Sequence, residues 1–183
     1  MDRQEALASV EANVENSNLI KHMLATEVIM RALAGELGED EEVWGVTGLI
    51  HDIDVELTEH DPALHSRLGA DLARNLGASD EMCQAVLCHN EAHGIPCETL
   101  LSKALFCSDP LTGLITAAAL VRPDKSLGGV TTESVMKRFK EKRFAAGASR
   151  ENIARCSEIG FTLEDFVGLA LKAMKGIAPD LGL

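Results

Sequence analysis

Histidine and aspartate residues, the side chains best suited to hold a divalent metal ion, stand at three separate places in the sequence. His51 is followed directly by Asp52, with Asp54 two residues later. His22 lies in an apolar stretch upstream, and Asp109 interrupts an apolar segment downstream. An ionised aspartate among apolar residues is costly unless it is paired or binds a metal. Two histidines and two aspartates from three helices would make a metal site with two nitrogen and two oxygen ligands and room for water.

Each of these residues, taken alone, also has a purely structural interpretation. A buried neutral histidine needs a hydrogen-bond partner, and Asn18 and Thr26 are within reach of His22 on its own helix. Asp109 would serve as the N-cap of a helix that restarts after a kink. The metal-site interpretation therefore rests on the set of residues and not on any single one.

The elements that must position these residues are helices, because apolar residues recur at helical spacing and no segment alternates like a strand. Asp61, Pro62 and Gly77 suit the N-cap, the first position and the left-handed C-cap of one helix. Pro110 is expected to kink or break the long helix that contains it. Gly48, shortly before the His-Asp pair, leaves its helix face open to another helix or a hydrated ion. The pattern predicts an all-α bundle of about eight to nine helices, at about 3–13, 18–37, 40–53, 62–76, 79–89, 98–121, 132–142, 149–159 and 162–175.

Composition restricts the partners and the environment. The chain has 183 residues, a formal net charge of −12 and a sequence pI near 4.9, which disfavours duplex nucleic acid or an anionic membrane as a partner. Apolar residues make up 46% and aromatic residues only 3%, so we expect one domain with an aliphatic core. No apolar run is long enough to span a membrane, and the N-terminus does not resemble a signal segment. Five cysteines without a Cys-x-x-Cys pair indicate reduced thiols and a cytoplasmic location.

The ordered set of residues resembles the HD-domain superfamily of metal-dependent phosphohydrolases. The matching residues are His22, then His51-Asp52 within Leu49-Ile50-His51-Asp52-Ile53-Asp54, and Asp109 within Cys107-Ser108-Asp109. The resemblance covers about 18–122, and the helices over about 131–176 are similar to those that follow the domain in small bacterial members. It implies a single HD domain over 1–183, built as a helical bundle around a metal site.

Two further histidines extend the resemblance to HD domains that hold two metal ions. His65 begins a His-x-x-x-Gly segment, and His89 stands at the next histidine position. We expect His65 to point inward because it shares a helix face with Leu68 and Leu72. Asn90 follows His89 where the cyclic-dinucleotide phosphodiesterase branch has a second histidine, which argues against that branch. The implied metal ligands are His22, His51, Asp52, His65, His89 and Asp109.

The activity that the resemblance implies is hydrolysis of a phosphate ester or nucleotide by metal-activated water. Asp52 offers two carboxylate oxygens with which to bridge two ions, and Asp54 or Glu56 would act as general base or orient a ligand. Four imidazoles favour one or two ions of Mn, Fe, Ni or Zn, with Mg less suited. The candidate phosphate-binding residues come from a basic run whose alternative interpretation is a solvated helix face, and they are Lys137, Arg138 and Lys140.

Two other functions would use the same ligands. HD-type di-iron oxygenases, such as the myo-inositol oxygenase family, present this ligand order to two irons and activate O₂. A nucleotide-sensing module would keep the fold and the metal with little turnover. Metal identification, oxygen uptake and phosphate release would distinguish these functions.

The remaining histidines and the cysteines suggest less. His60 and His93 are expected to be solvated loop residues. A zinc site made of Cys88, His89, His93 and Cys97 is disfavoured, because its spacing does not match the usual two pairs of ligands.

Overall fold

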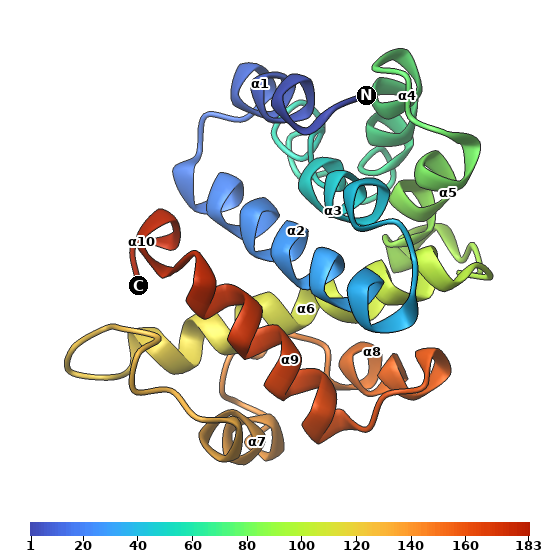
Figure 1. The fold of residues 1–183 in the computed structure, drawn as a ribbon. Helices are drawn as coiled ribbons and strands as arrows, with labels where there is room; N and C mark the ends of the chain where they lie inside the picture. Colours follow the sequence, from blue (N-terminus) through green and yellow to red (C-terminus); the bar gives the residue numbers. More distant parts are fainter.

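Two long helices, α2 (Ser17–Leu37) and α6 (Leu100–Leu120), pass through the middle of the molecule, and the remaining helices pack around them (Figure 1). The computed structural model describes residues 1–183 and contains ten α-helices, two short 3₁₀ helices and no β-strand. The other α-helices are α1 (Arg3–Asn13), α3 (Glu41–Ile50), α4 (Arg67–Asn75), α5 (Asp80–Cys88), α7 (Thr132–Lys140), α8 (Arg150–Ala154), α9 (Leu163–Gly176) and α10 (Ala178–Leu181). The 3₁₀ helices are Glu91–His93 and Arg155–Ile159. The predicted all-α fold is confirmed, and α10 is the one helix that the periodicity did not indicate.

One continuous apolar core joins helices from both ends of the chain. It holds 42 buried residues, from Ala6 in α1 to Leu181 in α10. Trp44 and Phe166 are its only aromatic members, so the core is aliphatic as predicted. Helix α2 packs against α3, α6 and α9, as expected for a helix that is apolar on most sides.

Short polar side chains fix where most helices begin. Each accepts a hydrogen bond from a backbone N–H of the first turn, which would otherwise lack a partner. These N-cap residues are Asp2, Asn16, Asp40, Ser79, Thr99, Thr131, Ser149 and Thr162. Helix boundaries are therefore determined mainly by local sequence, and most predicted boundaries lie close to the observed ones.

Helices α2 and α3 approach each other closely at Gly48. A Cβ atom at this position would lie 3.0 Å from the backbone carbon and oxygen of Thr26, so only glycine fits without moving α2. His22 lies one helical turn before Thr26 on α2. The close approach of the two helices therefore places His22 beside the end of α3. The bare face expected beside the His-Asp pair is thus covered by a helix.

The predicted start of the fourth helix at Asp61 and Pro62 is wrong. The chain forms turns there, and α4 begins only at Arg67. The helix is interrupted at Ser66, whose φ of 67° is left-handed. Its N–H donates to a carboxylate oxygen of Asp54 at 2.8 Å instead of to a helical carbonyl. A tertiary hydrogen bond therefore overrides the local helix-start signal.

The predicted face with Leu68 and Leu72 is buried only in part, since Leu72 is half-buried and packs against the core. Leu64 and Leu68 are 55% and 38% exposed. Helix α4 instead buries the small residues Gly69, Ala70 and Ala73. His65 faces the interior because of the turn at the next residue, and not because it shares a face with leucines.

Helix α6 is not broken at Pro110. It continues without interruption from Leu100 to Leu120. The Thr112 hydroxyl donates to the backbone carbonyl of Asp109 at 2.7 Å, beside the proline. Asp109 thus lies inside a continuous helix and is not an N-cap.

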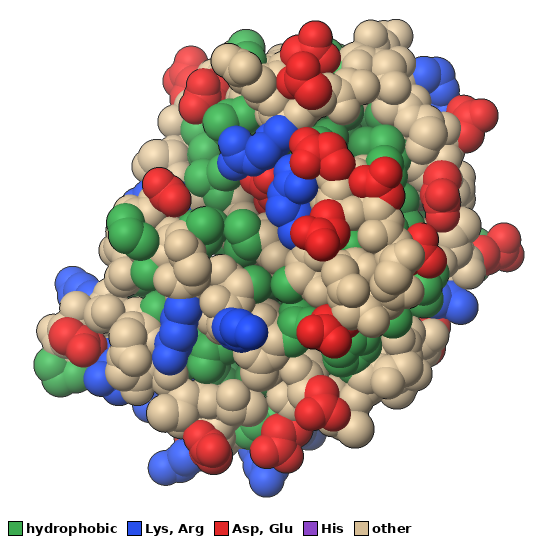
Figure 2. Space-filling model, viewed as in Figure 1, with side chains coloured by type: hydrophobic (Ala, Val, Ile, Leu, Met, Phe, Trp, Pro, Cys, Tyr) green, Lys and Arg blue, Asp and Glu red, His purple; other side chains and the backbone are tan.

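Charged side chains are dispersed over the surface. On the face shown in Figure 2, Lys and Arg side chains occur in small groups among Asp and Glu, without one continuous basic surface. No histidine is visible on this face. None of the helices is both long enough and apolar enough to cross a membrane.

Candidate metal centre

The six predicted metal ligands converge on one region of the bundle. His51 is the C-cap of α3, Asp52 begins the turns that follow, and His89 is the C-cap of α5. The other three are His22 on α2, His65 just before α4, and Asp109 on α6. Potential ligand atoms lie within 4.8 Å of one another in two sets, His22 with His51 and Asp109, and His51 with Asp52 and His89.

Four of these side chains surround one point. Nε2 of His22 lies 3.2 Å from Nε2 of His51 and 3.0 Å from Oδ1 of Asp109. Oδ2 of Asp52 completes the group, at 3.5 Å from Nε2 of His22 and 3.4 Å from Nε2 of His51. This is the set of two histidines and two aspartates that the sequence predicted.

The other oxygen of Asp52 faces a second pair of histidines. Its Oδ1 lies 3.3 Å from Nε2 of His65 and 3.2 Å from Nε2 of His89. A single carboxylate therefore directs one oxygen to each set of imidazoles. This is the arrangement expected of a carboxylate that bridges two ions.

Every one of the four imidazoles is held by a hydrogen bond from its outward-facing Nδ1. His51 and His89 contact the backbone carbonyls of Gly48 and Val86, at 2.7 Å and 2.6 Å. Carbonyl oxygens accept only, so in both rings Nδ1 carries the hydrogen. The Nε2 atoms of His51 and His89 are thereby left free to face inward.

His22 and His65 are fixed in the same way by side chains. Nδ1 of His22 lies 2.8 Å from the hydroxyl of Thr112, and Nδ1 of His65 lies 2.8 Å from Oδ1 of Asp54. The Thr112 hydroxyl donates to a carbonyl, so it accepts from His22. Four Nε2 lone pairs thus point at each other and at carboxylates, which is unfavourable unless a cation lies between them. The residues present fit a divalent metal ion.

The carboxylates raise the pKa values of the histidines that face them. Burial lowers the pKa of His22, but hydrogen bonds and charge from Asp109 and Asp52 outweigh it and raise the pKa to about 10. Burial likewise lowers the pKa of His65, and Asp52 and Asp54 raise it to about 10. Burial raises the pKa of Asp109, but His22 and nearby His51 hold it far below its usual range. The raised pKa values of His22 and His65 favour their protonated forms near neutral pH when no metal ion is bound.

Asp54 orients His65 and has no surface open to substrate. It is fully buried, and besides His65 it accepts hydrogen bonds from the backbone N–H groups of Ser66 and Gly69, at 2.8 Å and 2.7 Å. Of the two roles considered from sequence, the geometry matches the orienting one. Glu56 instead accepts hydrogen bonds from the backbone before α2 and lies outside the centre.

His93 also supports this side of the centre, contrary to its predicted role as a solvated loop residue. Its Nε2 lies 2.7 Å from the backbone carbonyl of His65, which the side-chain amide of Asn90 contacts at 3.1 Å. His60 is exposed, as predicted.

The disfavoured zinc site is not formed. Cys88 and Cys97 are buried with their Sγ atoms 2.8 Å apart. His89, however, turns to Asp52 and His93 turns to a backbone carbonyl. The four side chains do not share a point.

Two cavities open onto the metal centre. One of about 440 Å³ borders Asp52, His65, His89 and Asp109. The other, of about 370 Å³, borders His22 and Asp109. Both volumes are typical of small-molecule sites.

The predicted phosphate-binding residues lie elsewhere. Lys137, Arg138 and Lys140 are on α7 and line neither of the two cavities. Arg138 pairs with Glu141 at 2.7 Å and stacks over the ring of Phe144 at 4.6 Å. The basic run forms a charged helix. The residues that border the two cavities, such as Gly147, belong to the segment after that helix.

Comparison with known proteins places the centre in a family. The HD domain family model matches residues 19–122, more than half of the chain, and this span contains all six converging residues. No solved structure matches the chain.

The chain is also similar to proteins named Ribonuclease Y. The protein from Lawsonia intracellularis is 31% identical over 103 residues, which cover 56% of this chain and 20% of the relative. The protein from Lachnoclostridium phytofermentans is 28% identical over 171 residues, 90% of this chain and 32% of the relative. This chain spans only about a fifth to a third of the length of these relatives. The shared region, the converging residues and the helical fold together show that the chain belongs to the HD domain family.

Proposed function

We propose that this protein is a metal-dependent phosphohydrolase that acts on a small phosphate ester, such as a nucleotide. The observation that carries the proposal is the position of Asp52 between two sets of inward-facing Nε2 atoms. The similarity to proteins named Ribonuclease Y supports the proposal. RNA is a phosphodiester, and this chain, which is similar to them, is an HD domain protein.

The metal would be one or two divalent transition ions. His22, His51 and Asp109 with one oxygen of Asp52 would hold the first, and His65 and His89 with the other oxygen would hold the second. Imidazole-rich sites suit Mn, Fe, Ni or Zn better than Mg, which prefers an all-oxygen shell. When bound, such ions lower the pKa of water and neutralise charge on a phosphoryl group.

The protein's own residues supply orientation and access. Asp52 and Asp109 border the cavities at the centre, so their oxygens are within reach of water and substrate. Asp52 is therefore the proposed catalytic carboxylate, and Asp54 is a positioning residue for His65. The outward hydrogen bonds of the four imidazoles hold the Nε2 atoms in place before substrate arrives.

A small substrate suits the charges around the centre. Neither of the two cavities there is lined by a Lys or Arg residue, and the whole chain carries a net charge of −12. Duplex nucleic acid requires many cationic contacts, so we expect neither it nor an anionic membrane to be a partner.

The test is to measure metal content and phosphate release on the same protein, purified without chelators. We expect one or two transition ions per chain and release of inorganic phosphate from a phosphate monoester or nucleotide, lost on chelation and restored by metal. Iron-dependent oxygen uptake without phosphate release would assign the centre to oxygenase chemistry instead. Nucleotide binding without turnover would indicate a sensing module.

A further inference from the structure

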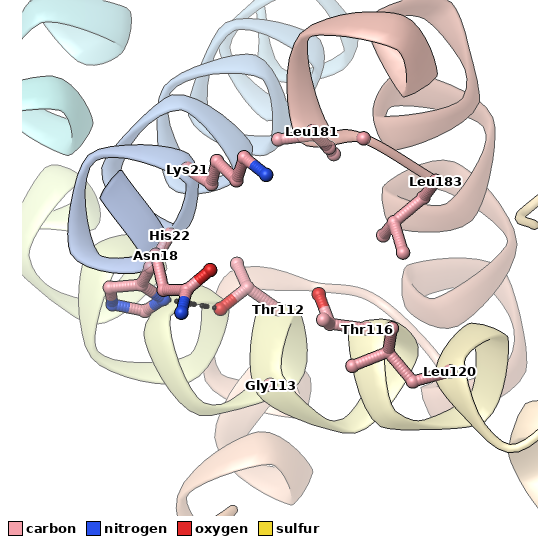
Figure 3. A pocket seen from close by; sticks show the side chains of 10 residues that line it. Asn18, Lys21, His22, Thr112, Gly113, Thr116, Leu120, Leu181 and Leu183 are labelled. Carbon is pink, nitrogen blue, oxygen red and sulfur yellow. Dashed lines mark hydrogen bonds between the residues drawn. The ribbon is translucent and has the colours of Figure 1, made fainter. Parts of the chain in front are cut away.

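A third cavity lies on the far side of His22 from the metal centre. It has a volume of about 340 Å³ and is enclosed by α2, α6 and the C-terminal residues around α10 (Figure 3). Thr112, whose hydroxyl holds the outward Nδ1 of His22, forms part of its wall. The cavity and the metal centre therefore share His22, whose Nε2 faces the metal centre and whose Nδ1 is held by Thr112 in the cavity wall.

Three polar side chains converge on this cavity without a partner in the protein. The Lys21 ammonium, the Asn18 amide and the Thr116 hydroxyl border it from two helices (Figure 3). Lys21 is half-buried and makes no ion pair, although the chain has 29 acidic residues. Lys21 is also the only Lys or Arg that lines this cavity or the two at the metal centre. Together these groups present hydrogen-bond donors to an oxygen acceptor.

Three leucines supply the apolar part of the cavity lining. These are Leu120, Leu181 and Leu183, and Leu120 is 49% exposed even though it is a large apolar side chain (Figure 3). The donors lie among these leucines, because the Lys21 ammonium is beside Leu181 and Thr116 is one turn before Leu120 (Figure 3). A lining of both kinds suits an organic ring that carries acceptor oxygens.

This cavity adjoins the metal centre through two shared lining residues. His22 and Gly113 line both it and the neighbouring cavity that borders Asp109. A Cβ atom at Gly113 would meet nothing within 4 Å, so the glycine is not required by packing. Because Gly113 has no side chain, the exposed space over this turn of α6, which borders both cavities, stays open, and we call it the passage.

We propose that this cavity binds the organic group of the substrate while the phosphate lies at the metal centre. The substrate class is a phosphate monoester whose organic group carries a ring with carbonyl or hydroxyl oxygens. Lys21, Asn18 and Thr116 recognise those oxygens, and the ring rests on the leucines. This assignment rests on the proposed phosphohydrolase function, and it makes Lys21 a specificity-determining residue.

Binding of two phosphonates to the Mn²⁺-loaded protein, measured by calorimetry, tests the assignment. One probe is the phosphonate analogue of uridine 5′-monophosphate, in which a methylene group replaces the ester oxygen, so it cannot be hydrolysed there. The other is benzylphosphonate, whose ring has no acceptor oxygen. We expect Lys21→Met to weaken binding of the uridine analogue by about tenfold or more, since it removes a charged hydrogen bond, and to leave benzylphosphonate unaffected. Lys142→Met, at an exposed lysine outside the cavities, controls for the change in net charge.

A second pair of variants tests the passage. Gly113→Leu should block it and weaken binding of the uridine analogue by about tenfold or more, whereas Gly113→Ala should leave binding within about twofold. Both changes replace an exposed helical glycine by a better helix former, so the fold is retained.

The outcomes separate this assignment from the proposed function. Equal affinity of the parent for both phosphonates, or no effect of Lys21→Met and Gly113→Leu, would overturn the cavity assignment. Phosphate release from uridine 5′-monophosphate and from phenyl phosphate is measured separately. If neither ester is hydrolysed while the binding differences hold, the hydrolase proposal fails and the cavity remains assigned as a ligand site.

Discussion

The buried carboxylate of Asp54 accepts a hydrogen bond from Nδ1 of His65 at 2.8 Å, and the same carboxylate holds the left-handed turn at Ser66. One side chain therefore orients a metal-facing imidazole and also decides where α4 begins. Folding of this segment and formation of the second half of the metal centre are coupled through Asp54.

Asp54→Asn should loosen both features. The amide offers fewer acceptor sites than the carboxylate, so a buried donor is left poorly satisfied, at a cost of about 1–3 kcal/mol in the free energy of unfolding. Urea unfolding measures this loss, and metal analysis should show weaker binding of one ion. Asp61→Asn is the control and should change neither quantity, because Asp61 is exposed and accepts only from the backbone N–H of Ala63 in a local turn. Unchanged stability in both variants would contradict the role of Asp54.

Asp52→Ala should abolish metal retention and turnover while the helices still form. Asp52 is the one residue whose two oxygens contact both sets of imidazoles. Metal analysis, phosphate release and far-ultraviolet circular dichroism measure the three properties. His60→Ala should alter none of them, because His60 is exposed and lies outside the centre. Equal loss in the two variants would mean that the site is misplaced.

His65→Ala should leave one ion bound if the centre holds two. Nε2 of His65 faces Oδ1 of Asp52, whereas the set around His22 uses Oδ2, so that set keeps its ligands. Turnover should fall by about 10²–10³-fold, because a catalytic metal ion contributes several kcal/mol to the transition state. His22→Ala should remove the other ion. A parent protein with one ion per chain, unchanged in His65→Ala, would show that the centre is mononuclear.

Stability of the metal-free protein should fall as the pH rises. The folded-state pKa values of His22 and His65 are raised to about 10, above the value of about 6.5 expected when unfolded. A raised pKa contributes stability that is full below about pH 6.5 and is lost as the pH approaches about 10. Thermal unfolding of chelator-treated protein should show this decline. Metal-loaded protein should show a much smaller decline over the same range, because the ion replaces the protons on these histidines. If stability falls equally with pH in the metal-free and metal-loaded protein, the assignment of His22 and His65 as metal ligands is contradicted.

Gly48→Ala should separate α2 from α3. The new Cβ would lie 3.0 Å from the backbone of Thr26, which cannot rotate away, so we expect a loss of about 1–3 kcal/mol in the free energy of unfolding. Metal affinity should fall as well, because this contact carries His22 to His51. Gly113→Ala meets nothing within 4 Å and should be neutral or slightly stabilising. Equal effects of the two glycine changes would argue against the close approach.

Sequence alone was sufficient for the helical fold and for the set of converging residues. Helix ends depend on hydrogen bonds to caps such as Asp40, Ser79 and Thr99, which act within a few residues. The order of His22, His51-Asp52 and Asp109 was recognisable because it resembles that of the HD-domain superfamily, and the cost of such residues in apolar helices is consistent with a partner or an ion there.

Tertiary structure decided what each of these residues contacts. The partner of His22 is Thr112, 90 residues away, and not its neighbours Asn18 or Thr26 on the same helix. Thr112 had no distinguishing signal beyond its place one turn after Asp109. Long-range contacts of this kind depend on which helices pack together, and local periodicity does not contain that information.

The same limit applies to the reason why His65 faces inward and to the position of the basic run. His65 faces inward because the carboxylate of Asp54, 11 residues upstream, accepts hydrogen bonds from Nδ1 of His65 and from the backbone N–H of Ser66. The second of these bonds fixes the turn at Ser66. The basic residues of α7 are displaced from the cavities because the helix packs on α6 and α9, which leaves the following segment at the metal centre. Residue types and caps act locally and can be read from the chain, whereas the surroundings of the centre exist only once distant segments have packed together.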